Sequence, residues 1–128
     1  MSKRVTIFGG SGFVGRHITR RMVDVGWNVR IAVRDQQNAQ FLKTFGQDGQ
    51  VDVMSCSILD EAAVKAALAD ADAVVNCVGI LAEAGANSFD ALQSQGAERI
   101  ARLAADQGIE TMVQISAIGA DMEAASNY

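Results

Sequence analysis

The sequence is poor in several residue types, and each shortage removes a class of protein from consideration. It contains no proline, one histidine and two cysteines, Cys56 and Cys77. The cysteines show neither metal-binding nor redox spacing, so we expect buried thiols in a reducing cytosol. No apolar run approaches the roughly 18 residues of a membrane span. Residues Met1–Arg4 lead directly into an apolar segment, which is not the pattern of a signal peptide.

Charged residues are also few, at 20%, and no segment concentrates them. The net charge of −4 comes without a basic block, which argues against nucleic acid binding. The acidic residues Glu61, Asp70 and Asp72 form no metal-ligand pattern. With 49% hydrophobic residues, the 128-residue chain is long enough for one globular domain with a real core. We therefore expect one domain over residues 1–128, in the cytoplasm.

Glycine, in contrast, is concentrated directly after the first apolar segment, Arg4–Phe8. Two templates fit: Gly10, Gly12 and Gly15 give G-x-G-x-x-G, and Gly9, Gly12 and Gly15 give G-x-x-G-x-x-G. Such glycines permit a tight turn, a close approach to a pyrophosphate and close helix–sheet packing, while the helix N-terminus attracts the anion. The strand–turn–helix context favours a dinucleotide site. The candidate binding residues are Gly9, Gly10, Ser11, Gly12, Phe13, Val14 and Gly15.

Strand and helix patterns alternate along the whole chain. The predicted strands are Arg4–Phe8, Asn28–Val33, Val51–Cys56, Ala73–Val78 and Thr111–Ile115. The predicted helices cover about residues 12–25, 37–45 and 61–68, and from 87 or 88 to 106. This alternation predicts an α/β fold, a doubly wound parallel sheet of the Rossmann type in the order 3-2-1-4-5. In that order Cys56 and Cys77 lie on opposite sides of the first strand, too far apart for a disulfide.

Side-chain spacing in the first helix predicts one buried and one exposed face. The expected buried stripe is Phe13, Val14, Ile18, Met22 and Val25, and the expected exposed residues are Arg16, Thr19, Arg20 and Asp24. In the second strand, Arg30 is expected to be a surface residue. The lone histidine, His17, is expected on the polar side of the helix and away from any site.

Four stretches together resemble the short-chain dehydrogenase/reductase superfamily, of the extended or atypical type. They are the glycine turn over 9–15, the second strand over 29–35, Val75–Leu81, and Gln114–Asp121. The Val-Gly-Ile-Leu and Ser-Ala-Ile-Gly-Ala-Asp runs are similar to the nucleotide-binding accessory subunit of respiratory complex I and its bacterial epimerase/dehydratase-like relatives. The resemblance covers the whole chain.

The resemblance also implies that the chain is a fragment or is truncated. Such proteins continue into a substrate-binding part, and a Tyr-x-x-x-Lys pair follows the fifth strand. Here Tyr128 stands where that tyrosine would be, and it is the last residue. In the family the tyrosine is the acid/base, the lysine lowers its pKa, and a serine orients the substrate carbonyl. Ser116 is the candidate serine, although many relatives use the next position, which is Ala117 here.

The end of the second strand bears on the choice of cofactor. An arginine there attracts the 2′-phosphate of NADP(H), whereas an acidic residue binds the ribose hydroxyls of NAD(H). Position 34 is arginine, which favours NADP(H), but Asp35 follows and could take the acidic role if the strand register differs by one. Arg16, in the first turn of the helix, could assist or could be a solvated surface residue.

The resemblance implies three further cofactor contacts. The adenine is expected at the end of the third strand, where the superfamily often has aspartate and this chain has Ser57. Val78 and Gly79 are expected to flank the adenosine ribose and the diphosphate. Serine can still hydrogen-bond an amino group but carries no charge, so the departure weakens the adenine assignment.

Three functions remain open on this reading. The first is an NADP(H)-dependent oxidoreductase or epimerase/dehydratase-like enzyme acting on a small carbonyl or quinone substrate. The second is a non-catalytic dinucleotide-binding subunit, peripheral to a membrane complex. Ser57 and Ala117 favour this second function. The third is a nucleotide sensor that docks onto a partner. A lysine four places after Tyr128 would favour the enzyme. A homo-oligomer is possible on this reading.

Overall fold

The computed structural model describes residues 3–9, 13–77 and 86–114, and only the backbone of residues 13, 86–95 and 114. The elements are β1 (Arg4–Phe8), α1 (Phe13–Asp24), β2 (Asn28–Val33), η1 (Gln37–Phe45, a 3-10 helix), β3 (Val51–Ser55), α2 (Glu61–Ala67), β4 (Ala73–Asn76), α3 (Ala86–Asp106) and β5 (Thr111–Gln114). Every predicted element is present, and its ends agree with the prediction to within one or two residues.

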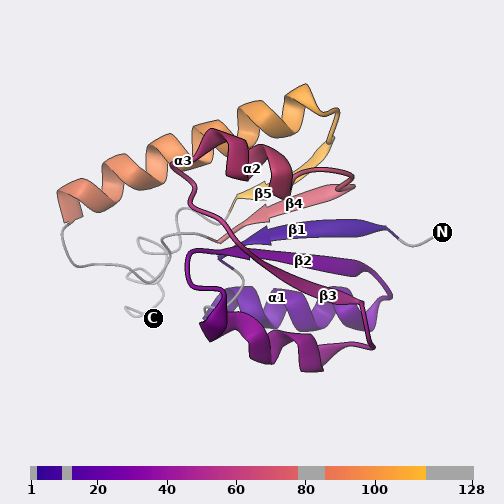
Figure 1. The fold of residues 1–128 in the computed structure, drawn as a ribbon. Coiled ribbons are helices and arrows are strands. Elements are labelled where there is room, and N and C mark those ends of the chain that lie inside the picture. Colours follow the sequence, from indigo (N-terminus) through magenta and orange to yellow (C-terminus); the bar gives the residue numbers. More distant parts are fainter. Residues whose placement is uncertain (1–2, 10–12, 78–85, 115–128) are drawn as a thin grey trace, which may run out of the picture.

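The strands form one parallel sheet in the order β3-β2-β1-β4-β5, which confirms the predicted Rossmann topology. The central strand fixes the register, because Phe8 of β1 is aligned with Ala32 of β2 and with Asn76 of β4. The carboxyl ends of the strands therefore meet at one edge, on the left of Figure 1. In a sheet of this kind ligands bind at that edge.

Helices cover both faces of the sheet, with α1 and η1 on one side and α2 and α3 on the other (Figure 1). Each face has its own core because neighbouring residues of a strand point to opposite sides. The core under α1 and η1 includes Ile7, Ile31 and Leu42, and all three are fully buried. The core under α2 and α3 includes Phe8 and Ile100, which are also fully buried. The sheet is thus closed to water on both faces, as a parallel sheet requires.

Two helix boundaries have a local cause. Asp60 caps the start of α2, where its carboxylate accepts a hydrogen bond of 3.2 Å from the Ala63 N–H. Gly26, the second residue after α1, has a φ of 92°, a left-handed conformation that favours glycine. None of the helices in the described part of the chain is long and apolar enough to cross a membrane.

The predicted faces of α1 need two corrections. Val25 is not buried: it is 68% exposed, because the helix ends at Asp24 and Val23 takes the place in the core. Thr19 is not exposed: it is fully buried. Its hydroxyl donates to the Gly15 carbonyl oxygen at 2.8 Å, so its polar atom is satisfied one turn back in the helix.

Arg30 is also placed differently from the prediction, because it is half-buried. Its Nη1 donates to the carbonyl oxygens of Ala67 at 2.8 Å and Ala69 at 2.7 Å, while the Thr6 hydroxyl donates to Ala67 at 2.7 Å. The last carbonyls of a helix lack partners within the helix. Side chains of β1 and β2 therefore cap the end of α2. Burial, followed by the charge of Arg4, lowers the pKa of Arg30.

Both cysteines are free and buried, on opposite faces of the sheet, so the prediction that they form no disulfide is confirmed. Burial raises the pKa of Cys56 to about 11, with a smaller contribution from the Asp60 carboxylate. Burial alone raises the pKa of Cys77 to about 11. These thiols remain protonated at neutral pH, which makes them poor nucleophiles in the folded state.

The raised thiol pKa values predict a loss of stability at alkaline pH. Thiols of the unfolded chain ionise as the pH passes about 9, whereas those of the folded chain do so only near 11. The unfolded state then binds fewer protons, so the free energy of unfolding falls between these two values. At about pH 10 we expect a loss of roughly 1 kcal/mol for each thiol.

Urea unfolding at about pH 8 and about pH 10, in reductant, measures this loss. A Cys56→Ala/Cys77→Ala protein provides the control, because lysine and tyrosine titrate in both proteins. We expect the fall in stability between the two pH values to be smaller in the control. An equal fall in both proteins would contradict the assignment to the thiols.

Candidate functional site

Gly9 is the first residue beyond β1, at the carboxyl edge of the sheet. Its φ of 77° confirms that a left-handed glycine turns the chain out of the strand. Its N–H donates to the carbonyl oxygen of Ala32 on the neighbouring strand at 3.0 Å. The amide of Gly9 is therefore used within the sheet, and the contribution of this glycine is its backbone conformation.

The start of α1 lies directly after the turn, and the residues of its first turn favour the binding of an anion. No acidic residue occupies its first turn, where N–H groups without helical partners carry a partial positive charge. Gly15 and Thr19, one turn apart on the same face of α1, are both buried. Small residues on this face suit the close helix–sheet packing expected of the third glycine. Val14, beside Gly15, is half-buried.

Arg16 projects from the same turn and packs against η1. Its guanidinium lies 4.9 Å from the centre of the Phe41 ring, and Phe41 in turn forms an edge-to-face pair with Phe45 at 6.0 Å. Arg20 lies over the Phe45 ring at 4.3 Å. Such cation–π contacts hold an exposed arginine in place. No local sequence pattern predicts this stack, because the arginines and the rings come from different elements.

Arg34 and Asp35 follow β2 at the same edge, and both are exposed. The Asp35 carboxylate accepts hydrogen bonds from the Gln37 N–H at 3.1 Å and from the Asn38 side-chain amide at 2.7 Å. Asp35 therefore contributes to the start of η1, which is a structural use of its charge. Arg34 is the first residue after the end of the strand.

Ser57 is the second residue of the loop between β3 and α2 and is half-buried. Its Oγ accepts a hydrogen bond from the Leu59 N–H at 3.2 Å, and its carbonyl oxygen accepts one from the Asp60 N–H at 3.0 Å. The hydroxyl keeps its own proton and a second lone pair for another partner. The start of the loop is tied to the sheet, since the Cys56 N–H donates to the carbonyl oxygen of Val33 at 2.8 Å.

Asn76 is a polar residue at this edge that is absent from the predicted site. It is the last residue of β4 and is 1% exposed, in register with Phe8. The signal was available, since Asn76 is the one polar residue in the apolar run 73–78. A buried polar side chain at the carboxyl edge is a candidate site residue.

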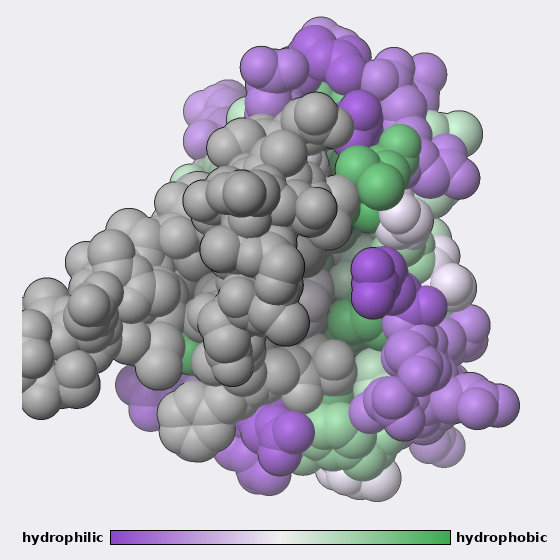
Figure 2. Space-filling model, turned by 90° about the vertical axis from the view of Figure 1, so that its left-hand side faces the viewer, coloured by the Kyte–Doolittle hydropathy of each residue, from purple (hydrophilic) through white to green (hydrophobic). Residues whose placement is uncertain are grey.

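Several predicted site residues lie outside the described part of the chain. They are Gly10, Ser11, Gly12, Val78, Gly79, Ser116 and Tyr128, and of Phe13 only the backbone is described. The residues that the structure does bring to one edge are Gly9, Val14 and Gly15 with Arg34 and Ser57. Figure 2 views the molecule from this side, where hydrophobic and hydrophilic residues both reach the surface around the grey region.

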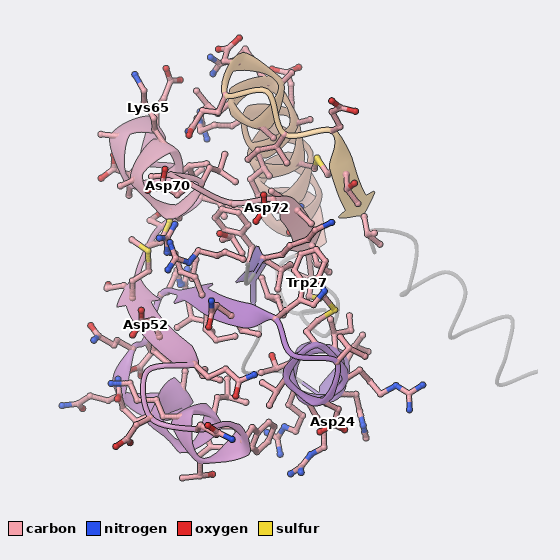
Figure 3. All side chains as sticks on the ribbon, turned by 90° about the vertical axis from the view of Figure 1, so that its right-hand side faces the viewer. Asp24, Trp27, Asp52, Lys65, Asp70 and Asp72 are labelled. Atoms are coloured by element: carbon pink, nitrogen blue, oxygen red, sulfur yellow. The ribbon has the colours of Figure 1, made fainter. Side chains whose placement is uncertain are left out.

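The opposite edge of the sheet carries several acidic side chains. Figure 3 shows this edge, with Asp52, Asp70 and Asp72 at the amino ends of the strands. The Asp72 carboxylate accepts from the Arg4 N–H at 2.9 Å, and Lys3 lies over the Trp27 ring at 5.8 Å. Among the described residues no three His, Cys, Asp or Glu side chains are grouped so that they could hold a metal ion.

A parallel sheet of this order with a glycine turn after its first strand defines an NAD(P)-binding Rossmann domain. The sequence profile of a family described as NAD(P)H-binding matches residues 9–128, and the chain belongs to that family.

Two mitochondrial proteins are similar to this chain over most of its length. The chain is 32% identical over 123 residues to the mitochondrial NADH dehydrogenase [ubiquinone] 1 alpha subcomplex subunit 9 of Arabidopsis thaliana, covering 94% of this chain and 31% of that protein. It is 30% identical over 116 residues to the mitochondrial NADH-ubiquinone oxidoreductase 40 kDa subunit of Neurospora crassa, covering 91% and 31%. The chain thus spans about a third of the length of these relatives.

Among solved structures, uronate dehydrogenase from Agrobacterium tumefaciens has the same fold. The TM-score is 0.71 at 21% identity, and the match covers 88% of this chain and 40% of the dehydrogenase. The predicted resemblance to short-chain dehydrogenase/reductase and epimerase-like proteins, and to the respiratory complex I subunit, is therefore confirmed.

Proposed function

We propose that the carboxyl edge of the sheet binds NADP(H) in preference to NAD(H). In this arrangement the pyrophosphate lies at the start of α1, and the 2′-phosphate lies at Arg34. The observation that carries the preference is the pair Arg34 and Asp35: the arginine is exposed at the end of β2, while the carboxylate accepts two hydrogen bonds within η1. The sequence alone leaves open whether Arg34 or Asp35 contacts the ribose. The hydrogen bonds of Asp35 favour Arg34 as the residue that contacts the cofactor.

Other residues extend this site. Gly9, Gly10, Ser11, Gly12, Phe13, Val14 and Gly15 form the turn and first helical residues around the pyrophosphate. Ser57 contacts the adenine, and Val78 and Gly79 flank the ribose and diphosphate. Arg16, held over Phe41, adds positive charge near the 2′-phosphate. Residues 1–128 are then the dinucleotide-binding domain of a longer protein.

The Arg34→Ala variant tests the 2′-phosphate contact. We expect the preference for NADPH over NADH to fall roughly tenfold, because one charge-assisted hydrogen bond contributes about 1.5 kcal/mol or more. NADH affinity stays near its starting value, and fluorescence titration measures both constants. Arg21→Ala, at an exposed arginine in the last turn of α1, is the matched control. An unchanged NADPH preference in Arg34→Ala would show that the assignment is wrong.

The intact protein, on this proposal, is an oxidoreductase or epimerase/dehydratase-like enzyme. Tyr128 acts as the acid/base beside the nicotinamide, and Ser116 orients a small carbonyl or quinone substrate. Free tyrosine titrates near 10, so the tyrosine needs a nearby cation to act as a base at neutral pH. Turnover assays of the intact protein with NADPH and carbonyl or quinone substrates test this role. Tight NADPH binding without turnover would contradict it.

A second candidate is a subunit that holds the dinucleotide without turnover, associated with a respiratory membrane complex. The names of the Arabidopsis and Neurospora relatives favour this function. Ser57 in place of aspartate and Ala117 in place of a second serine point the same way. Co-purification of the intact protein with a respiratory complex, with bound dinucleotide and without turnover, would support it over the enzyme.

A further inference from the structure

Helix α3 lies against the loop that joins β3 to α2, at the adenine end of the proposed site. Gly96 of α3 faces Ile58 of the loop, and a Cβ at Gly96 would collide with the Ile58 side chain. Only glycine allows the helix to come this close. Ile58 and the fully buried Ile100 of α3 belong to the same core. The loop is therefore packed directly against the helix.

Arg99, one turn away from Gly96, makes the polar contact to this loop. Its Nη1 donates to the carbonyl oxygen of Ile58 at 2.6 Å, and its Nε lies 3.9 Å from Glu61 Oε1. Arg102 also pairs with Glu61, at 2.7 Å, but has no hydrogen bond to the loop among those described. The side chain of Arg99 is 21% exposed, against 48% for Arg102. A charge-assisted bond in such a shielded place is stronger than one in water.

We propose that Arg99 is a positioning residue for the adenine end of the dinucleotide. By holding the Ile58 carbonyl oxygen, it fixes the main chain that carries Ser57 before the dinucleotide binds. A site that is formed in advance loses less conformational entropy on binding, so it binds more tightly. This inference rests on the proposed function, because it takes Ser57 as part of the cofactor site.

The test compares Arg99→Met with Arg102→Met in the intact protein. Methionine keeps the length and the apolar stem of arginine but removes its donors, and Arg102→Met removes a partner of Glu61 without touching the loop. We expect the Kd for NADPH to rise roughly fivefold in Arg99→Met and to change less than about twofold in Arg102→Met. Arg99→Lys retains a donor and should recover part of the affinity.

A double-mutant cycle with Ser57→Ala shows whether Arg99 acts through the loop. If it does, Ser57→Ala weakens NADPH binding in the wild-type background and has little further effect in Arg99→Met. If Arg99 contributed only to overall stability, Ser57→Ala would raise the Kd for NADPH by the same factor in the wild type and in Arg99→Met. The same cycle with Arg102→Met provides the reference for independent residues.

Cys56, at the start of the loop, gives a measurement that needs no dinucleotide. Cys56 is 4% exposed, so its reaction with a thiol reagent requires the loop to open. In a Cys77→Ser background Cys56 is the one thiol within residues 1–128. With the modification measured at Cys56 itself, we expect Arg99→Met to raise its reaction rate roughly tenfold. Arg102→Met should leave the rate near its starting value.

Equal thiol rates in Arg99→Met and Arg102→Met would overturn the proposal, and so would multiplicative effects of Arg99→Met and Ser57→Ala on Kd. A protein that binds neither NADPH nor NADH would instead overturn the proposed function. In that case the thiol rates still decide whether Arg99 fixes the loop: a rise confined to Arg99→Met supports this, and equal rates contradict it.

Discussion

Replacing Phe8 by alanine is expected to lower the free energy of unfolding by about 3–5 kcal/mol. Phe8 ends the central strand and is fully buried in the core under α2 and α3. Strands β2 and β4 flank it at Ala32 and Asn76, so the surrounding backbone is held by the sheet and cannot collapse into the space left behind. The loss therefore combines the lost burial of the ring with the cavity that remains.

Urea unfolding of Phe8→Ala and Phe41→Ala compares the same chemical change at a buried and at an exposed position. Phe41 is 38% exposed, and it makes the stack with Arg16, so its truncation should lower the free energy of unfolding by about 1 kcal/mol. Phe8→Leu keeps most of the volume and should lie between the two alanine variants. Equal losses at Phe8 and Phe41 would contradict the described core.

The fold was predictable because its elements are local patterns. Each strand is a short, largely apolar run, and a left-handed glycine follows both α1 and β1. The order of the strands then follows from right-handed crossovers in an alternating chain. Asp60 is a further local signal, because a helix cap depends on residues only a few positions apart.

The errors arose where the burial of a polar residue depends on a hydrogen bond that a hydropathy pattern does not record. Spacing alone placed Thr19 on the polar face of α1, but its hydroxyl bonds within the helix and leaves it free to face the sheet. Arg30 is half-buried because the end of α2, 37 residues away, supplies carbonyl acceptors. A sequence pattern records which residues are polar, but it does not record which acceptors the fold brings to them.

The candidate site also combines features that the sequence predicts with features that it does not. The turn at Gly9 and the strand-end positions of Arg34 and Ser57 follow from the order of the elements. The contact of Arg99 with Ile58, 41 residues away, does not, because it depends on how closely α3 approaches the loop. The proposed preference for Arg34 over Asp35 likewise rests on hydrogen bonds that Asp35 accepts from residues of η1, which no strand or helix pattern predicts.

Gly9→Ala is expected to weaken NADPH binding roughly 100-fold, which is the largest functional effect we predict. An alanine at a φ of 77° is strained by about 1–2 kcal/mol, and the turn can relieve this strain only by changing its path. The Gly9 N–H is bonded to the Ala32 carbonyl oxygen at 3.0 Å, so that end of the turn is held by the sheet. The change of path then falls on the residues that follow, whose N–H groups face the pyrophosphate in the proposed site.

Gly49→Ala separates backbone strain from cofactor binding. Gly49 has a φ of 79°, nearly that of Gly9, nothing lies within 4 Å of the added Cβ, and it precedes β3 at the opposite edge of the sheet. The two variants should therefore lose similar stability in urea unfolding, about 1 kcal/mol or slightly more. Only Gly9→Ala should lose affinity for NADPH in a fluorescence titration. If both variants bound NADPH as the wild type does, the turn after β1 would not be the phosphate site, since its conformation would not matter for binding.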